Sequence, residues 1–167
     1  CTTGETPEVD DCVARFLLSD FPPGLKVAHL AKDPNEQALW FTDLRGGYLG
    51  RYGFGETKPV KLYPLPGSYS NPDPTSGLDF GGFPWTLRVT DEAVFFNEFR
   101  DRDLVRFDKA RQTFHELHVP IASDQLTLHS IDIDEHAERL WFTLSMEERI
   151  SLPQSISSIG YVDLKSW

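Results

Sequence analysis

The sequence has no long apolar segment and almost no cysteine. No window approaches the run of about 18 apolar residues that a membrane helix requires, so we expect no membrane partner. The first residues lack the basic start and apolar core of a secretion signal. We therefore expect a cytoplasmic protein, or one secreted and processed to this form. Cys1 and Cys12 are the only cysteines, and the sequence leaves open whether they are bridged.

Basic residues are also scarce. Lys and Arg total 16 against 26 Asp and Glu, which gives a formal net charge of -10 and an isoelectric point of about 4.8. Such an acidic surface does not neutralise phosphate groups, so we expect no nucleic-acid partner. Motifs of nucleotide, serine-hydrolase and thiol-redox sites are missing as well: there is no Gly-rich phosphate loop, no Gly-x-Ser-x-Gly turn and no Cys-x-x-Cys pair.

Turn-forming and aromatic residues, by contrast, are abundant. Twelve Gly, twelve Pro and 13% aromatic residues are spread over the 167 residues of the chain. Pro and Gly interrupt helices, whereas Phe, Trp and Tyr favour the pleated surface of a sheet. We therefore predict a single all-β domain built from many short strands.

Three segments repeat one pattern of strands and turns. The aromatic markers Trp40, Phe95 and Trp141 stand 55 and 46 residues apart. The expected strands are 27–31, 39–43, 48–52 and 60–66, then 84–89, 94–98, 103–108 and 114–120, then 128–133, 140–144 and 159–163. Four strands recurring at roughly 40 to 50 residues are typical of propeller blades. A β-sandwich of unrelated strands is the alternative architecture.

These strands divide the chain into blades. We assign the blades to residues 25–66, 84–120 and 126–167, the last of which lacks its outermost strand. Residues 1–24 form an N-terminal segment with one outer strand at 13–18. Together the expected strands number twelve, which describes a partial propeller in a single domain.

The first segment carries a motif that resembles a known family. The motif begins with Val-Ala-His-Leu-Ala at 27–31, continues with Leu-Trp-Phe-Thr-Asp at 39–43 and Gly-Arg-Tyr at 50–52, and ends with Tyr-Pro-Leu-Pro at 63–66. It resembles the repeat of the streptogramin lyase (virginiamycin B lyase) family and, more broadly, gluconolactonase-like β-propellers. Residues 126–167 resemble fungal members especially. The resemblance covers 13–167 and implies four-stranded antiparallel blades, of which this chain supplies about three in a six- or seven-bladed ring.

Three blades do not close a ring. An arc of three leaves a sheet face open at each end, and apolar faces of that size do not persist in a soluble monomer. The remaining blades therefore come from the rest of a longer chain or from a second copy of this one. In the second case each copy lends its N-terminal strand to the last blade of the other.

Candidate site residues lie where the innermost strands start and the second strands end. Innermost strands line the central channel of a propeller, and ligand sites gather at its mouth. The residues at these positions form three pairs: His29 with Asp43, Trp85 with Glu98, and His129 with Leu144. In this alignment Trp85 replaces a His in the second blade, and Leu144 replaces an acid in the third.

The family resemblance implies a chemistry for these residues. Streptogramin lyases hold Mg²⁺ with His and Glu side chains at the mouth and open a cyclic depsipeptide by elimination. This implies that His29, His129 and Asp43 are catalytic, since a His of near-neutral pKa removes a proton next to a carbonyl. Trp85 and Glu98 then contact a small-molecule substrate. Mg²⁺ is the implied cofactor, with Asp43 and Glu98 as its candidate ligands.

Other interpretations remain open for the same residues. His29 and His129 also fit hydrogen-bonded structural histidines at strand starts, and Trp85 fits ordinary packing. A fungal secondary-metabolite cyclase of the hetero-Diels–Alderase type agrees with the loss of the full His and acid set. A lactone hydrolase requires a carboxylate-rich Ca²⁺ site. A propeller that binds a ligand or protein without catalysis is the alternative outside enzymes.

Overall fold

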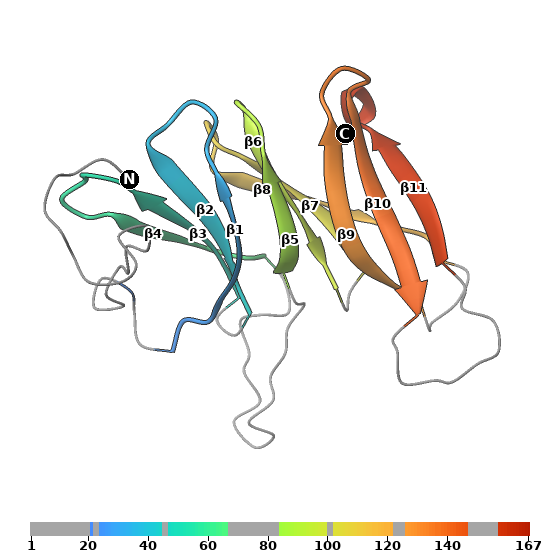
Figure 1. Cartoon of the computed structure of the whole chain (residues 1–167), viewed down its shortest axis with the longest axis horizontal. Coiled ribbons are helices and arrows are strands. Elements are labelled where there is room, and N and C mark those ends of the chain that lie inside the picture. The colour runs from blue at the N-terminus through green and yellow to red at the C-terminus, as the bar shows by residue number, and fades with distance from the viewer. Residues whose placement is uncertain are drawn as a thin grey trace, which may run out of the picture.

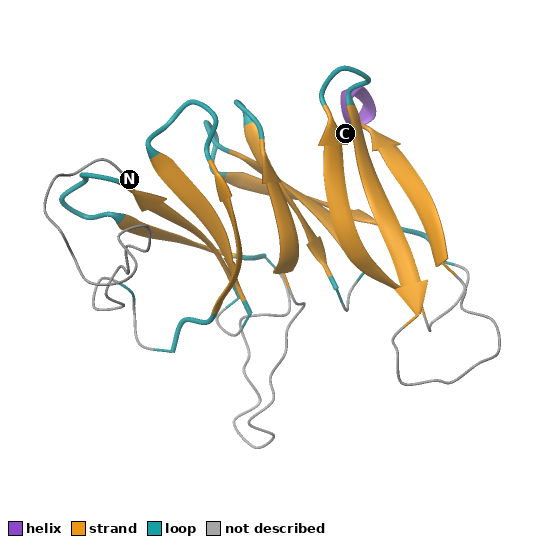
Figure 2. Cartoon of the chain, in the orientation of Figure 1, coloured by secondary structure: helices purple, strands orange, loops and turns teal. Residues whose placement is uncertain are grey.

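Strands dominate the computed structural model of the chain (Figure 2). It describes residues 21, 24–44, 47–66, 84–99, 102–121, 126–146 and 157–167. The one helical element in these ranges is the short 3-10 helix η3 (Leu164–Ser166), and no helix there is long and apolar enough to cross a membrane. The expected strand at 13–18 and the cysteines Cys1 and Cys12 lie outside the described residues.

The strands form three antiparallel sheets that stand side by side (Figure 1). The first sheet has the order β1 (Val27–Lys32), β2 (Ala38–Asp43), β3 (Tyr48–Gly53) and β4 (Val60–Pro64). The second sheet has the order β5 (Pro84–Val89), β6 (Ala93–Glu98), β7 (Asp103–Asp108) and β8 (Thr113–His118). The third sheet contains β9 (Leu126–Asp134), β10 (Arg139–Met146) and β11 (Ser157–Asp163), with β10 in the middle. This arrangement confirms the predicted all-β fold of propeller blades.

The second sheet is covered on both faces, as its strand β6 shows. Val94 and Phe96 lie in an apolar cluster shared with Trp40 of the first sheet. Ala93 and Phe95 lie in a second cluster, shared with β9 and β10 of the third sheet. Because side chains alternate across a strand, an unbroken apolar run is buried only when both faces are covered. The sandwich alternative is wrong, since two sheets cannot cover both faces of one of them.

Two glycines allow an aromatic ring to lie against the sheet. Phe41 pairs with Gly50 across β2 and β3, and Phe142 pairs with Gly160 across β10 and β11. A Cβ atom on either glycine would overlap the neighbouring phenyl ring. Glycine is therefore required at these positions by the close approach of the ring. The recurring pairing of Phe with Gly therefore reflects packing of the blades.

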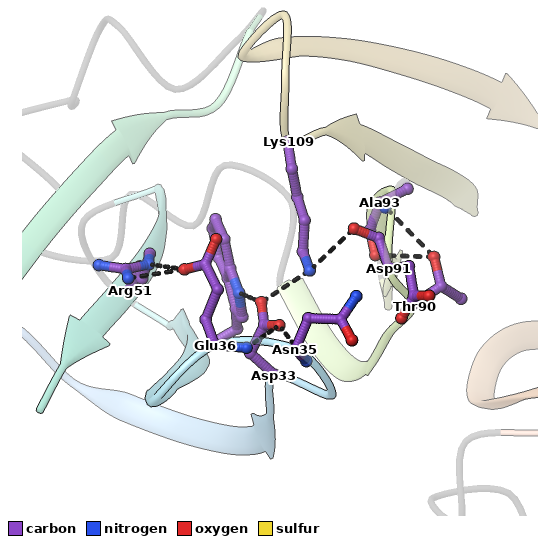
Figure 3. A network of polar contacts seen from close by, with 9 residues as sticks. Asp33, Asn35, Glu36, Arg51, Thr90, Asp91, Ala93 and Lys109 are labelled. Carbon is purple, nitrogen blue, oxygen red and sulfur yellow. Dashed lines mark hydrogen bonds and ion pairs between the residues drawn. The ribbon is translucent and has the colours of Figure 1, made fainter.

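A buried ion pair joins the first and second sheets just after β1 (Figure 3). Asp33 is fully buried, and its carboxylate accepts hydrogen bonds from Trp40 Nε1 at 2.8 Å and Lys109 Nζ at 2.7 Å. The backbone N–H groups of Asn35 and Glu36 also donate to it. Burial alone would raise the pKa of Asp33, but the bonds from Lys109 and Trp40 hold it below its ordinary value. The charged carboxylate therefore fastens this turn to the neighbouring sheet.

We expect Asp33→Ala to lower the free energy of unfolding by about 3 kcal/mol, because the largely buried Lys109 ammonium loses its partner. Denaturant unfolding followed by tryptophan fluorescence measures the change. Asp91→Ala is the control, since the Asp91 side chain is exposed and only its backbone carbonyl accepts from Lys109. The control should cost less than about 0.5 kcal/mol. Equal losses in the two variants would contradict a stabilising role of the ion pair.

Candidate functional site

The innermost strands of the three sheets lie next to one another, β1 beside β5 and β5 beside β9 (Figure 1). His29 lies near the start of β1, Trp85 near the start of β5 and His129 near the start of β9. Contacts between rings, given below, connect these residues across the three sheets. The strand starts therefore bring together three of the predicted site residues.

Each innermost strand carries one extra residue close to its start. The pairing register with the second strand shifts between Val27 and Leu30 in β1 and between Pro84 and Leu87 in β5. In β9 the shift falls at His129. A β-bulge of this kind redirects side chains and is common beside active sites. The candidate residues thus occupy the one irregular stretch that all three sheets share.

The register corrects one expectation from the sequence. Each innermost strand has one residue that pairs with a Phe of the second strand. The residue directly before it is His29 in β1, Thr86 in β5 and Ser130 in β9, so these three positions are equivalent. Trp85 and His129 share the position one residue earlier. The expectation that Trp85 and His129 occupy the place of His29 is therefore wrong by one residue. Alignment by residue type does not reveal this offset, because it depends on which residues pair across the strands.

Two polar side chains that the sequence-based prediction omitted hold the bulges in place. Thr42 Oγ1 accepts from the backbone N–H of His29 at 3.3 Å and donates to the backbone carbonyl of Trp85 at 3.0 Å. Asn97 Oδ1 accepts from the backbone N–H of Thr86 at 3.1 Å, and Asn97 Nδ2 donates to a carbonyl of β9 at 2.8 Å. Both residues directly precede the last residue of a second strand. That shared position is the signal that could have identified them.

Four rings form a continuous row across the strand starts. The His29 and Trp85 ring centroids are 4.6 Å apart, with 63° between the ring planes. Trp85 contacts Phe99 at 6.1 Å, and Phe99 contacts His129 at 6.1 Å. Phe99 follows the end of β6 and was not among the predicted residues. The row places the aromatic rings of Trp85 and Phe99 between two imidazoles, a combination that suits an organic molecule with a proton to move.

The surroundings of His29 disfavour the charged form of its imidazole. Burial lowers the pKa of His29, and the nearby positive charge of Arg88 lowers it further. Arg88 is in turn fixed by an ion pair between its Nε and Asp132 Oδ1 at 2.8 Å and by a bond from its Nη1 to the carbonyl of Leu87. A neutral imidazole can accept a proton at neutral pH. His29 is therefore suited to act as a base.

The two carboxylates predicted at the mouth are buried. Asp43 is fully buried and Glu98 is 2% exposed. Asp43 Oδ1 accepts from the backbone N–H of Lys26 at 2.7 Å, and Glu98 pairs with Pro84 at the start of β5. No group of three or more His, Cys, Asp or Glu that could hold a metal ion occurs in the described ranges. These residues do not fit the Mg²⁺ site implied by the resemblance.

Comparison with known proteins gives matches in structure only. No protein-family model and no curated protein matches the chain. The structure is similar to a catalytically inactive virginiamycin B lyase from Staphylococcus aureus with quinupristin, at a TM-score of 0.57 and 17% identity over 83% of this chain and 42% of that one. It is also similar to a periplasmic gluconolactonase from Pseudomonas aeruginosa, at a TM-score of 0.51 and 12% identity over 81% of this chain and 41% of that one.

A third similar structure has a different coverage. It is a conserved lipoprotein from Clostridium novyi NT, at a TM-score of 0.58 and 9% identity over 88% of this chain and 92% of that one. The chain spans less than half the length of the lyase and the gluconolactonase. At these identities the likeness concerns the fold alone, and it agrees with the arrangement of the three sheets: the chain folds as blades of a β-propeller.

We expect the pKa of His29 to lie below its ordinary value of 6.5. The unfolded chain then takes up a proton near pH 6.5 while the folded chain does not, so the stability present above pH 6.5 declines as the pH falls toward the folded pKa. NMR titration of the imidazole C–H signals, assigned by their absence in His29→Gln, measures this pKa. Arg88→Ala should move it upward. A midpoint at or above 6.5 in the unaltered chain would contradict the assignment.

Proposed function

We propose that the strand-start mouth belongs to the active site of a lyase-like enzyme that acts on a small organic molecule. The observation that carries the proposal is the half-buried imidazole of His29 packed against Trp85, where burial lowers its pKa. A base of this kind, beside aromatic side chains, suits removal of a proton from a carbon next to a carbonyl. The propeller fold shared with a lyase and a lactonase supports an enzyme in general.

In the proposed reaction His29 takes the proton from the carbon next to a carbonyl. The electron pair of that C–H bond forms a carbon–carbon double bond, and the neighbouring carbon–oxygen bond of a ring ester breaks. The leaving group departs as a carboxylate, so the ring opens without water and without any oxidant. His129, which is exposed at the far end of the row, is the second acid/base group. Atoms and charge balance once the imidazolium returns its proton to solvent.

The other predicted residues receive supporting roles in this proposal. Asp43 acts as a positioning residue, because it is buried and holds the backbone that leads into β1 through the N–H of Lys26. Glu98 holds the corresponding place at the start of β5. Trp85 and Phe99 contact the substrate through their rings.

A cyclase is the second candidate, and the row of rings favours it. A cyclisation needs shape and hydrogen bonding more than a charged site, and Trp85 with Phe99 supplies apolar surface while Asp43 and Glu98 are buried. A lactone hydrolase is less favoured, because the described residues lack a carboxylate-rich cation site. A propeller without catalytic activity would bind its ligand at the same rings and would not convert it.

Incubation with quinupristin tests the lyase proposal. Elimination gives a linear isomer of unchanged mass, which reversed-phase chromatography separates from the ring. We expect His29→Ala to reduce the rate at least a hundredfold, because general base catalysis contributes about that much. His115→Ala is the matched control, since His115 is exposed on β8, the outermost strand of its sheet. It should leave the rate unchanged.

Other outcomes separate the alternatives. Ring opening at an equal rate in the His29→Ala variant would contradict the role of His29. Binding of quinupristin, detected by quenching of tryptophan fluorescence that Trp85→Phe abolishes, without conversion would favour the non-catalytic propeller. Conversion that persists after exhaustive chelation would agree with the buried positions of Asp43 and Glu98, whereas complete dependence on added Mg²⁺ would require ligands beyond those described.

A further inference from the structure

Arg88 is the charged side chain that acts on the candidate base His29. It belongs to β5, which lies between β1 and β9 (Figure 1). Its positive charge lowers the pKa of His29, in addition to the larger effect of burial. A guanidinium group stays protonated over the whole pH range in which proteins work, so this charge is permanent. Arg88 therefore belongs to the surroundings of the base, although it was not among the predicted site residues.

Two hydrogen bonds fix the guanidinium group of Arg88. Its Nε donates to Asp132 Oδ1 of β9 at 2.8 Å, and its Nη1 donates to the backbone carbonyl of Leu87 at 2.9 Å. The bond from Arg88 lowers the pKa of Asp132, so both members of the pair are charged at neutral pH. The third nitrogen, Nη2, has no partner among the residues that the structure describes. Arg88 thus combines a fixed position with a free donor.

The neighbouring strands balance the charge of Arg88 on one side only. Arg88 directly follows the residue of β5 that pairs with the second-strand Phe, and Asp132 and Ala31 hold this place in β9 and β1. Asp132 supplies a negative charge from β9. Ala31 supplies none from β1, the strand that carries His29. The uncompensated side of Arg88 is therefore the side of the candidate base.

Stability does not account for the ion pair of Arg88 and Asp132. Their side chains are 43% and 74% exposed. Ion pairs this exposed add little to stability, because water screens both charges. The pair of Asp33 and Lys109 differs, since both of those side chains are largely buried. Arg88 is instead accessible to a ligand at the mouth.

Arg88 opposes the proposed proton transfer unless a negative charge forms beside it. When His29 takes a proton it becomes a cation, and Arg88 repels that cation. In the proposed reaction the same step places negative charge on the carbonyl oxygen of the substrate. A guanidinium group attracts such an oxygen and donates a charge-assisted hydrogen bond to it. Arg88 therefore assists the reaction only where the substrate oxygen lies within its reach.

We propose that Arg88 binds the carbonyl oxygen of the substrate through Nη2 while His29 acts on the neighbouring C–H bond. The proposal rests on the proposed role of His29 and names the substrate class: a carbonyl compound with an acidic C–H and an ester oxygen on the next carbon. His29 takes the proton, and the C–H electron pair forms an enolate whose oxygen Arg88 holds. That pair then forms the carbon–carbon double bond as the carboxylate leaves. Arg88 keeps its own protons throughout.

A carboxylate ligand tests the anion site without any turnover. Phenylacetate is the probe, because its carboxylate resembles the enolate oxygen and its ring suits the row that contains Trp85 and Phe99. We expect millimolar phenylacetate to raise the pKa of His29 by about 1, since a negative charge a few ångströms away favours the imidazolium. NMR titration of the imidazole signals measures the change. Phenylacetamide, which has the same shape and no charge, should leave the pKa unchanged.

Two variants give this titration its controls. In Arg88→Gln the pKa of His29 should no longer respond to phenylacetate. In Arg111→Gln it should respond as in the unaltered chain, because Arg111 is 79% exposed in the turn after β7. Far-UV circular dichroism checks that both variants fold. A pKa that phenylacetate does not move in the unaltered chain, or moves equally in Arg88→Gln, would overturn the proposal.

The pH profile of quinupristin opening separates binding by Arg88 from its effect on the base. In Arg88→Gln we expect the midpoint of kcat/KM to move to higher pH, because the positive charge beside His29 is gone. We also expect the plateau above that midpoint to fall about a hundredfold, as when an oxyanion loses one donor. A shifted midpoint with an unchanged plateau would show that Arg88 acts only through His29, and would overturn the proposal.

Failure of the proposed function has a different signature. If the unaltered chain does not open quinupristin, that result counts against the lyase reaction. The phenylacetate titration still decides whether Arg88 binds an anion beside His29, since it requires no conversion of the ligand.

Discussion

The fold depends on covering both faces of each sheet. The run from Ala93 to Phe96 in β6 is apolar without alternation, so it is stable in water only between two other sheets. That constraint fixes the three sheets in a row. It also explains the buried pair of Asp33 and Lys109, which fastens a turn of one sheet to the next where apolar packing ends.

The same constraint produces the candidate site. The innermost strands belong to different sheets and do not pair with one another, so side chains hold the bulges near their starts. Thr42 and Asn97 each join a bulge in their own sheet to the backbone of the next sheet. The rings of His29 and Trp85 are thereby fixed against one another, and burial there disfavours a charged imidazole. Packing between blades therefore determines the electrostatics of the mouth.

Most of the fold could be predicted from the sequence, but the site could be predicted only in part. Short apolar runs between turn-formers located every strand in the described ranges, because strand formation here follows local alternation and turn chemistry. His29, Trp85 and His129 were found because they begin repeated strands. Phe99 was missed because it follows a strand and matters only through its contacts with rings on other sheets.

The sequence by itself determined the all-β composition, the repeat and the order of the strands, because these depend on residues close together in the chain. Only the tertiary structure decided the alignment of the site, since the pairing register puts His29 directly before the residue that pairs with the second-strand Phe, and Trp85 and His129 one residue earlier. The tertiary structure also decided that Asp43 is buried and that its carboxylate accepts a hydrogen bond from the backbone N–H of Lys26. Composition and spacing along the chain predict where the strands lie. Register depends on pairing between strands, and burial and the charge environment depend on contacts between sheets.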